Sequence, residues 1–234
     1  MNQTNAVKSV SDVLTGRLGL LTITPDQMAQ RRKEAEEFRR RQQEGRIKTL
    51  LAEAHAPLRQ LNQTQLDRQG EWAAAEAKIN GNLGSGFLVA LIGTRGSGKT
   101  QLAVETMRVN ADQGKRSRYG TATEFFIEIK STYDRQTSRT EKEVLEEFSK
   151  PSLLVLDEIG RRSESEWENR LLFELLNRRY NALKDTLLIS NQSPEEFANS
   201  IGSSLISRMI ETGGLINCTW PSYRQPEATQ LIPN

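Results

Sequence analysis

The sequence predicts an α/β fold, in which helices cover both faces of a parallel sheet, preceded by a helical region without strands. After residue 81, five short apolar segments rich in strand-forming residues alternate with longer helical segments; before it, no such apolar segment occurs. Alternating strands and helices with crossovers of this length imply parallel strands. The expected strands are Phe87–Ile92, Arg118–Ala122, Leu153–Leu156, Thr186–Ser190 and Leu215–Thr219.

The region before the sheet is expected to contain a short amphipathic helix and then a long charged one. In Thr24-Pro25-Asp26-Gln27, Thr24 fits an N-cap, the proline fits the first helical position, and Gln27 completes a capping box. Only Gly45 weakens a helix from there to about residue 55, and Pro57 ends it. The short helix is marked by an apolar stripe, Val7, Val10, Leu14, Leu18 and Leu21.

A local excess of positive charge lies in the expected long helix. Residues 31–48 carry eight basic and four acidic side chains, although the whole chain has a net charge of only +2. A solvated helix with ion pairs four residues apart and a helix that contacts phosphates both fit this pattern. The two interpretations stay open at this point.

The helices between the strands are expected at 98–113, 123–134, 140–149, 164–184 and 194–211. Capping boxes at Thr140…Glu143 and Ser193…Glu196 support two of the boundaries. Residues 225–234 have two prolines and no periodicity, so we expect a flexible tail there.

Composition excludes several classes of protein. The 234 residues are 36% hydrophobic and 26% charged, which is a globular composition. A single cysteine, Cys218, allows no internal disulfide. Because the chain also has only one histidine, it has too few ligands for a structural zinc site. No apolar segment approaches the length needed to span a membrane, so we expect a cytoplasmic protein.

The strongest motif is a phosphate-binding loop directly after the first strand. The eight residues 93–100 fit G-x-x-x-x-G-K-[ST] in full and open a helix. Glycines allow the backbone N–H groups to point at one anion, and Lys99 is expected to reach the β- and γ-phosphates. The Thr100 hydroxyl is expected to bind Mg²⁺. The predicted nucleotide-binding residues are Gly93, Thr94, Arg95, Gly96, Ser97, Gly98, Lys99, Thr100 and Gln101.

Two acids follow the apolar strand Leu153–Leu156. Ligands of open α/β sheets bind at the carboxyl ends of the strands, where these acids stand. We expect Asp157 to hold the Mg²⁺ and Glu158 to polarise an attacking water. A water-activating base favours a hydrolase over a small-molecule kinase.

Asn191 follows the next strand, Thr186–Ser190, and is expected to reach the same edge of the sheet. Its amide is suited to orient the water or to sense the γ-phosphate, although asparagine is also common in turns. The sequence after it lacks the Asn-Lys-x-Asp motif that reads guanine, which favours ATP over GTP.

Over about residues 81–224 the chain resembles the bacterial replicative-helicase loaders of the DnaC type and the related IstB-type transposase-accessory ATPases. The resemblance lies in Asp157-Glu158-Ile159-Gly160, Ser165-Glu166-Trp167-Glu168-Asn169, Asn177-Arg178-Arg179-Tyr180, Leu188-Ile189-Ser190-Asn191, Ile206-Ser207-Arg208-Met209 and Trp220-Pro221-Ser222-Tyr223-Arg224. It implies an AAA+ ATPase with strand order 5-1-4-3-2. Because only ten residues follow Arg224, the C-terminal helical lid of most AAA+ proteins is expected to be absent.

The resemblance also implies roles for further residues. Arg208 matches the arginine finger, which acts on the nucleotide of a neighbouring subunit, and Arg224 matches the second sensor arginine of its own subunit. Tyr133, Ser165 and Trp167 stand where the loaders carry residues that contact single-stranded DNA. A core position at the start of a helix is the alternative for Trp167.

The sequence therefore favours an ATPase, with ATP and Mg²⁺, that binds single-stranded DNA, self-associates and loads a hexameric replicative helicase. Its expected parts are a partner-binding region 1–62, a connection 63–80, the ATPase domain 81–224 and the tail 225–234. The alternatives are an IstB-type ATPase with a transposase as partner, a small-molecule P-loop kinase and a non-hydrolysing nucleotide switch.

Overall fold

The computed structural model describes residues 24–63, 70–134, 136–220 and 223. Five strands form one sheet in the order β2-β3-β4-β1-β5, and every neighbouring pair is parallel. This is the order 5-1-4-3-2 that the family resemblance implies. The strands are β1 (Leu88–Ile92), β2 (Ser117–Thr121), β3 (Leu153–Asp157), β4 (Asp185–Ile189) and β5 (Gly214–Asn217).

The helices alternate with these strands as expected. Their bounds are α2 (Pro25–Glu53), α3 (Leu58–Leu61), α4 (Gly70–Gly81), α5 (Lys99–Asp112), α6 (Ala122–Ser131), α7 (Glu141–Ser149), η1 (Ile159–Arg161), α8 (Glu166–Asn181), α9 (Pro194–Ile201) and α10 (Ser203–Thr212). The single helix expected at 194–211 is wrong: Gly202, with φ +86°, separates α9 from α10. No described helix has the length and apolarity to cross a membrane.

Helix α2 begins as the capping box predicts. Gln27 N donates to Thr24 Oγ1 at 3.2 Å, and Thr24 N donates to Gln27 Oε1 at 3.0 Å. The helix continues through Gly45, and every described side chain up to Gly45 is exposed. The apolar stripe at Val7–Leu21 lies outside the described residues.

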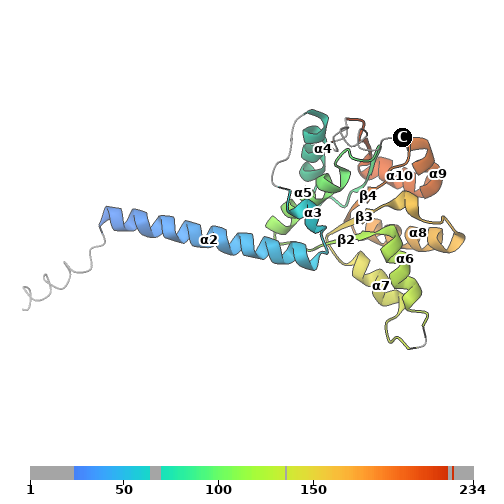
Figure 1. The fold of residues 1–234 in the computed structure, drawn as a ribbon, viewed down its shortest axis with the longest axis horizontal. Coiled ribbons are helices and arrows are strands. Elements are labelled where there is room, and N and C mark those ends of the chain that lie inside the picture. Colours follow the sequence, from blue (N-terminus) through green and yellow to red (C-terminus); the bar gives the residue numbers. More distant parts are fainter. Residues whose placement is uncertain (1–23, 64–69, 135, 221–222, 224–234) are drawn as a thin grey trace, which may run out of the picture. The chain divides into compact units, whose positions relative to one another are not determined.

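The chain divides into two compact units, Met1–Gly45 and Arg46–Asn234, and the sheet belongs to the second. Two apolar clusters cover the two faces of the sheet, because alternate residues of each strand point to opposite faces. On one face, Leu88, Ala90, Leu154 and Leu156 pack with α6, α7, α8, α9 and α10; on the other, Val89, Leu91, Val155 and Leu187 pack with α4 and α5 (Figure 1).

The end of α2 and all of α4 belong to the sheet-bearing unit. Leu51, Ala54 and Trp72 are buried in the same apolar cluster as the strand residue Leu91. Ala54 O also accepts a hydrogen bond of 2.7 Å from the backbone N–H of Tyr119 in β2. Residues 46–62 are therefore part of the packed body around the sheet.

Candidate functional site: a nucleotide cavity at the carboxyl edge of the sheet

The strand order brings the predicted nucleotide residues together. The phosphate-binding loop follows β1, and Asp157 ends β3. Strand β4 lies between β1 and β3, so Asn191, which follows β4, reaches the space between the loop and Asp157. All three segments meet at the carboxyl edge of the sheet, where α/β folds bind ligands.

Two glycines of the loop have conformations and surroundings that a side chain would disturb. Gly93 has φ +128°, and a Cβ there would lie 2.7 Å from Cys218 O. Gly98 has φ +80°, and a Cβ there would lie 3.2 Å from Trp72 Nε1. The loop therefore needs glycine here to approach its neighbours and to fold around an anion.

Lys99 lies within the loop. Its ammonium donates hydrogen bonds to Gly93 O at 2.8 Å and Thr94 O at 2.7 Å, and lies 3.3 Å from Ser97 Oγ. The residue is buried, with 5% of its surface exposed. A buried ammonium among backbone carbonyls provides the positive charge that a phosphate group would meet in this loop.

Asp157 and Thr100 together fit a magnesium site. Thr100 Oγ1 donates to Asp157 Oδ2 at 2.9 Å, so a hydroxyl and a carboxylate oxygen already adjoin each other. Mg²⁺ favours such oxygen ligands and commonly takes only one or two from the protein, the rest being water and substrate phosphates. The described residues contain no cluster of three acidic, histidine or cysteine side chains that would form a separate metal site.

Tyr119 holds Asp157 in place, a role that the sequence did not reveal. Its hydroxyl donates to Asp157 Oδ2 at 2.8 Å. Burial raises the pKa of Tyr119 far above its usual range, and the charge of Asp157 raises it further. The phenol therefore remains a hydrogen-bond donor to the carboxylate.

Glu158 projects from a strained turn directly after β3. Its φ is +58°, and its backbone N–H donates to Asp157 Oδ1 at 2.6 Å. Its carboxylate forms an ion pair with Arg161, with Nη1 3.1 Å from Oε1. Arg161 ends η1, three residues after Glu158, and this spacing explains the pair, which sequence reasoning had also missed.

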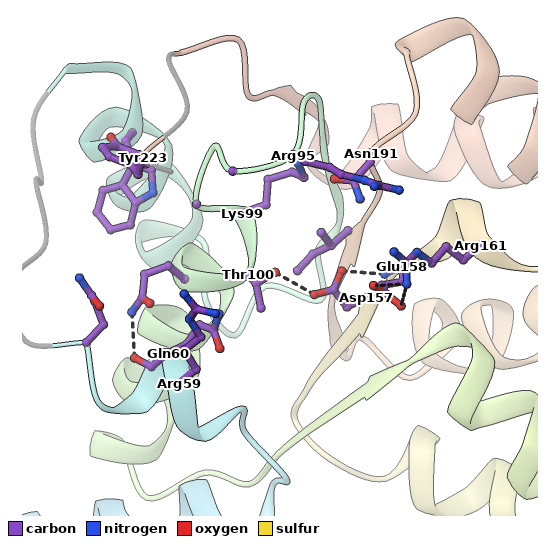
Figure 2. A pocket seen from close by; sticks show the side chains of 16 residues that line it. Arg59, Gln60, Arg95, Lys99, Thr100, Asp157, Glu158, Arg161, Asn191 and Tyr223 are labelled. Atoms are coloured by element: carbon purple, nitrogen blue, oxygen red, sulfur yellow. Dashed lines mark hydrogen bonds and ion pairs between the residues drawn. The ribbon is translucent and has the colours of Figure 1, made fainter. Parts of the chain in front are cut away.

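A cavity of about 480 Å³ connects these groups. Figure 2 shows Arg59, Gln60 and Tyr223 on one side of Lys99 and Thr100, and Asn191, Glu158 and Arg161 on the other. The lining residues that sequence reasoning had not assigned to the nucleotide are Arg59, Gln60, Gln63, Trp72, Arg161, Ile189 and Tyr223. Nothing in the spacing of Arg59 or Trp72 pointed to the cavity, since both lie more than twenty residues before the loop.

The segment after β5 covers the phosphate-binding loop. Trp220 Nε1 donates to Ser97 O at 2.6 Å, and Tyr223 N donates to Gly96 O at 2.9 Å. Trp220 and Tyr223, the described residues of the motif, thus contact the loop that lines the nucleotide cavity. Arg224 itself lies outside the described residues.

The family model of the IstB-like ATP binding proteins matches residues 79–229, which include the sheet, the loop and this covering segment. The chain belongs to this family. Replicative helicase loader DnaC of Escherichia coli K12 is 29% identical over 148 residues, which are 63% of this chain and 59% of DnaC. The match thus covers less than two thirds of the length of the DnaC relatives. An uncharacterized Escherichia coli protein, YdaV, is 26% identical over 85% of this chain and 82% of its own length.

Solved structures agree with the fold of the IstB-like family. A crystal structure of the DnaC helicase loader superposes with a TM-score of 0.57 at 23% identity, over 67% of this chain and 93% of that chain. DnaI gives a TM-score of 0.57 at 20% identity, over 72% of this chain and 94% of that chain. The sheet order and the P-loop place this IstB-like chain in the AAA+ fold.

In this IstB-like protein, Arg208 stands apart from the cavity. It lies on α10, and it is not among the described residues that line the nucleotide site. Its guanidinium stacks on two rings of α8, 5.3 Å from the centre of Phe173 and 5.2 Å from that of Tyr180. Its buried Nη1 has no hydrogen-bond partner within the described parts of the chain.

Two of the three residues expected to contact DNA, Tyr133 and Trp167, are in contact where α6 ends and α8 begins. Trp167 Nε1 donates to Tyr133 OH at 3.1 Å, and the two ring centres are 6.3 Å apart. Lys130 lies 5.2 Å above the Trp167 ring. Ser165 caps α8 by accepting a hydrogen bond from Glu168 N, so it has a structural role here.

Trp167 occupies an intermediate position between surface and core. It is half-buried against Phe126, with ring centres 5.8 Å apart, whereas Tyr133 is 55% exposed. Burial and the hydrogen bond to Glu141 raise the pKa of Tyr133. The result is an aromatic surface beside a cation, which is the arrangement on which nucleic-acid bases stack.

Proposed function

We propose that this chain is an ATP-dependent DNA replication protein that binds single-stranded DNA and loads a hexameric replicative helicase. One observation carries the proposal: a phosphate-binding loop, the Thr100–Asp157 pair that fits Mg²⁺, and Glu158 meet in one cavity of a chain related to the DnaC loaders. The role of loader is taken from those relatives. The chemistry is derived from the residues of the cavity.

Each polar group of the cavity has a distinct part in ATP hydrolysis. Lys99 balances the charge of the β- and γ-phosphates, and Thr100 and Asp157 hold Mg²⁺. A bound Mg²⁺ would supply positive charge at the phosphates. Glu158 accepts the proton of the attacking water, and Asn191 orients that water, since both line the cavity beyond the loop.

Arg208 is proposed to act on the nucleotide of a neighbouring copy. Its place outside its own cavity supports this role, because an arginine that stabilises the transferred charge must approach a γ-phosphate. Arg224 is proposed to act on the nucleotide of its own subunit. Hydrolysis would then depend on self-association.

Mixing two inactive variants tests the role of Arg208. We expect Arg208→Ala to bind ATP nearly as well as the wild type but to lose hydrolysis, and Lys99→Ala to lose binding. A mixture should regain part of the activity, because the Lys99→Ala subunit provides its arginine to the intact cavity of the other. If no mixing ratio restores turnover and Arg208→Ala alone already binds ATP poorly, the role in trans is wrong.

Partner identity decides between helicase and transposase. In the helicase proposal, residues 1–62 bind the helicase and residues 81–224 hydrolyse ATP. Residues 63–80 connect these two parts, and residues 225–234 form a tail. A transposase-accessory ATPase is the second candidate, favoured by the family name. Co-elution of the full chain with the replicative helicase of its host, and ATP-dependent transfer of that helicase onto circular single-stranded DNA, would support the loader. Co-elution with a transposase alone would support the second candidate.

A further inference from the structure

One wall of the nucleotide cavity comes from α3 and the residues after it. Arg59, Gln60 and Gln63 line the cavity from this segment, although they precede the phosphate-binding loop by about thirty residues. Figure 2 shows Arg59 and Gln60 extending from α3 beside the start of α5. None of these residues belongs to the nucleotide motifs of the sequence.

Helix α3 is held firmly on α5. Gln101 Nε2 donates to Gln60 O at 3.2 Å, and the guanidinium of Arg108 donates to Leu61 O. Just before α3, the bond of 2.7 Å from Tyr119 N to Ala54 O fixes the chain to β2. These three bonds fix the position of the Arg59 backbone relative to the cavity.

Arg59 is an exposed cation of this cavity with no hydrogen-bond or ion-pair partner among the described residues. Arg95, in the phosphate-binding loop, is a second exposed cation of the cavity, whereas Arg161 pairs with Glu158, and Lys99 donates to Gly93 O and Thr94 O. The side chains of Gln60, Gln63, Gln101, Trp72 and Tyr223, which also line the cavity, are neutral. A guanidinium in such surroundings is suited to bind an anionic oxygen of a ligand.

The position of Gln101 indicates which part of the nucleotide Arg59 meets. In a P-loop, the backbone N–H groups around Thr100 and Gln101 cradle the α- and β-phosphates. Gln101 contacts α3 directly, whereas the hydrolytic residues lie at the other side of the cavity. We propose, on the basis of the proposed ATP binding, that Arg59 binds the α-phosphate and that nucleotide binding thereby further stabilises residues 54–63.

Calorimetric titration of the full chain with ATP and with ADP, both with Mg²⁺, tests this assignment. We expect Arg59→Ala to raise the Kd of ATP and of ADP by about tenfold and by the same factor, because both carry an α-phosphate. Arg59→Lys should recover part of the affinity. The matched control is Arg116→Ala, which removes another exposed arginine outside the cavity and should change neither Kd.

Amide hydrogen exchange tests the second part. In the wild type, ADP should slow exchange in residues 54–63, and in Arg59→Ala at saturating ADP this protection should be lost. Wild-type Kd values in Arg59→Ala, or a loss confined to ATP, would overturn the α-phosphate contact while leaving the proposed function intact. Equal protection in both proteins would overturn the added stability that nucleotide binding is proposed to give residues 54–63. A wild-type chain that binds neither nucleotide would overturn the proposed function and this inference together.

Discussion

Glu158 combines backbone strain with a position at the ligand edge of the sheet. A φ of +58° is unusual for a glutamate, and such strain is found mainly where a site needs a particular side-chain direction. In this turn the backbone N–H of Glu158 donates to the Asp157 carboxylate. The Glu158 carboxylate lies beside the cavity and forms an ion pair with the exposed Arg161. The two adjacent acids thus point to different tasks: Asp157 is placed to bind Mg²⁺, and Glu158 is placed to act as a base.

Glu158→Gln should therefore separate binding from hydrolysis. The amide has nearly the shape of the carboxylate but cannot accept a proton, so we expect turnover to fall by roughly 10²- to 10⁴-fold with ATP affinity retained. Turnover is measured by phosphate release and affinity by calorimetric titration. Glu195→Gln, at an exposed position in α9, is the matched control and should match the wild type. Hydrolysis at the wild-type rate in Glu158→Gln would remove Glu158 from the catalytic role.

At the scale of single elements, the surface between α6 and α8 is the candidate for DNA. Base stacking on an aromatic side chain contributes roughly 1–3 kcal/mol, so Tyr133→Ala or Trp167→Ala should weaken single-stranded DNA binding by about tenfold or more. Fluorescence anisotropy with a labelled oligonucleotide at two salt concentrations measures this. The loss of affinity from lost stacking should be similar at both salt concentrations, whereas a phosphate contact contributes less to affinity as the salt concentration rises.

The control for this experiment is Ile127→Ala, an exposed apolar residue of α6 outside the aromatic cluster, which should bind DNA like the wild type. Because Trp167 also packs on Phe126, its variant is checked for thermal stability, and Tyr133→Ala provides the independent measurement. Wild-type binding by both variants at both salts would assign the cluster to packing alone.

Helix α8 also contains a fully buried arginine that holds the loop before β3. Arg179 donates to the carbonyls of Phe148, Pro151 and Asp185, and to Thr186 Oγ1. Burial lowers the pKa of Arg179 to about 9, so the guanidinium stays charged at neutral pH. Its charge is thus balanced mainly by aligned backbone carbonyls.

Arg179→Met should lower the free energy of unfolding by about 3 kcal/mol or more, because several buried carbonyls lose their donor at once. Arg178→Met is the control on the same helix: Arg178 is exposed and forms an ion pair with Glu174, and the expected loss is about 0.5 kcal/mol. Urea unfolding monitored by circular dichroism measures both. Equal losses for the two variants would contradict the role of Arg179.

The elements show what the sequence could and could not predict. Local patterns fixed the five strands, the P-loop and the caps at Thr24, Thr140 and Ser193, since these depend on neighbouring residues. Contacts between distant segments, such as that of Tyr119 with Asp157, could not be predicted from the sequence. It also missed the break at Gly202, because the apolar spacing continues across it from Phe197 to Leu205.

At the scale of the whole molecule, the division of the chain differs from the boundary that composition suggested. Residues 46–62 contain no strand-like apolar segment and therefore fall within the helical region that the sequence places before residue 81, but Leu51 and Ala54 are buried beside Trp72 and the sheet. Composition changes near residue 81, whereas packing changes near residue 46, because a few apolar residues are enough to attach a helix end to a core. The proposed partner-binding function therefore lies more narrowly within residues 1–45.

Two truncations should separate partner binding from ATP turnover. We expect the chain 46–234 to keep wild-type ATP turnover and nearly the same melting temperature, because it contains the whole sheet-bearing unit. It should no longer bind the helicase, because it lacks the proposed partner-binding region. The chain 63–234 should lose both stability and turnover, since it lacks α3 and the buried side chain of Leu51, whose burial alone contributes about 2 kcal/mol. Thermal melts, phosphate release and co-elution with the helicase measure the three properties. If 63–234 melts and hydrolyses ATP like 46–234, residues 46–62 are not part of the ATPase unit, and if 46–234 still co-elutes with the helicase, the partner surface lies on the sheet-bearing unit.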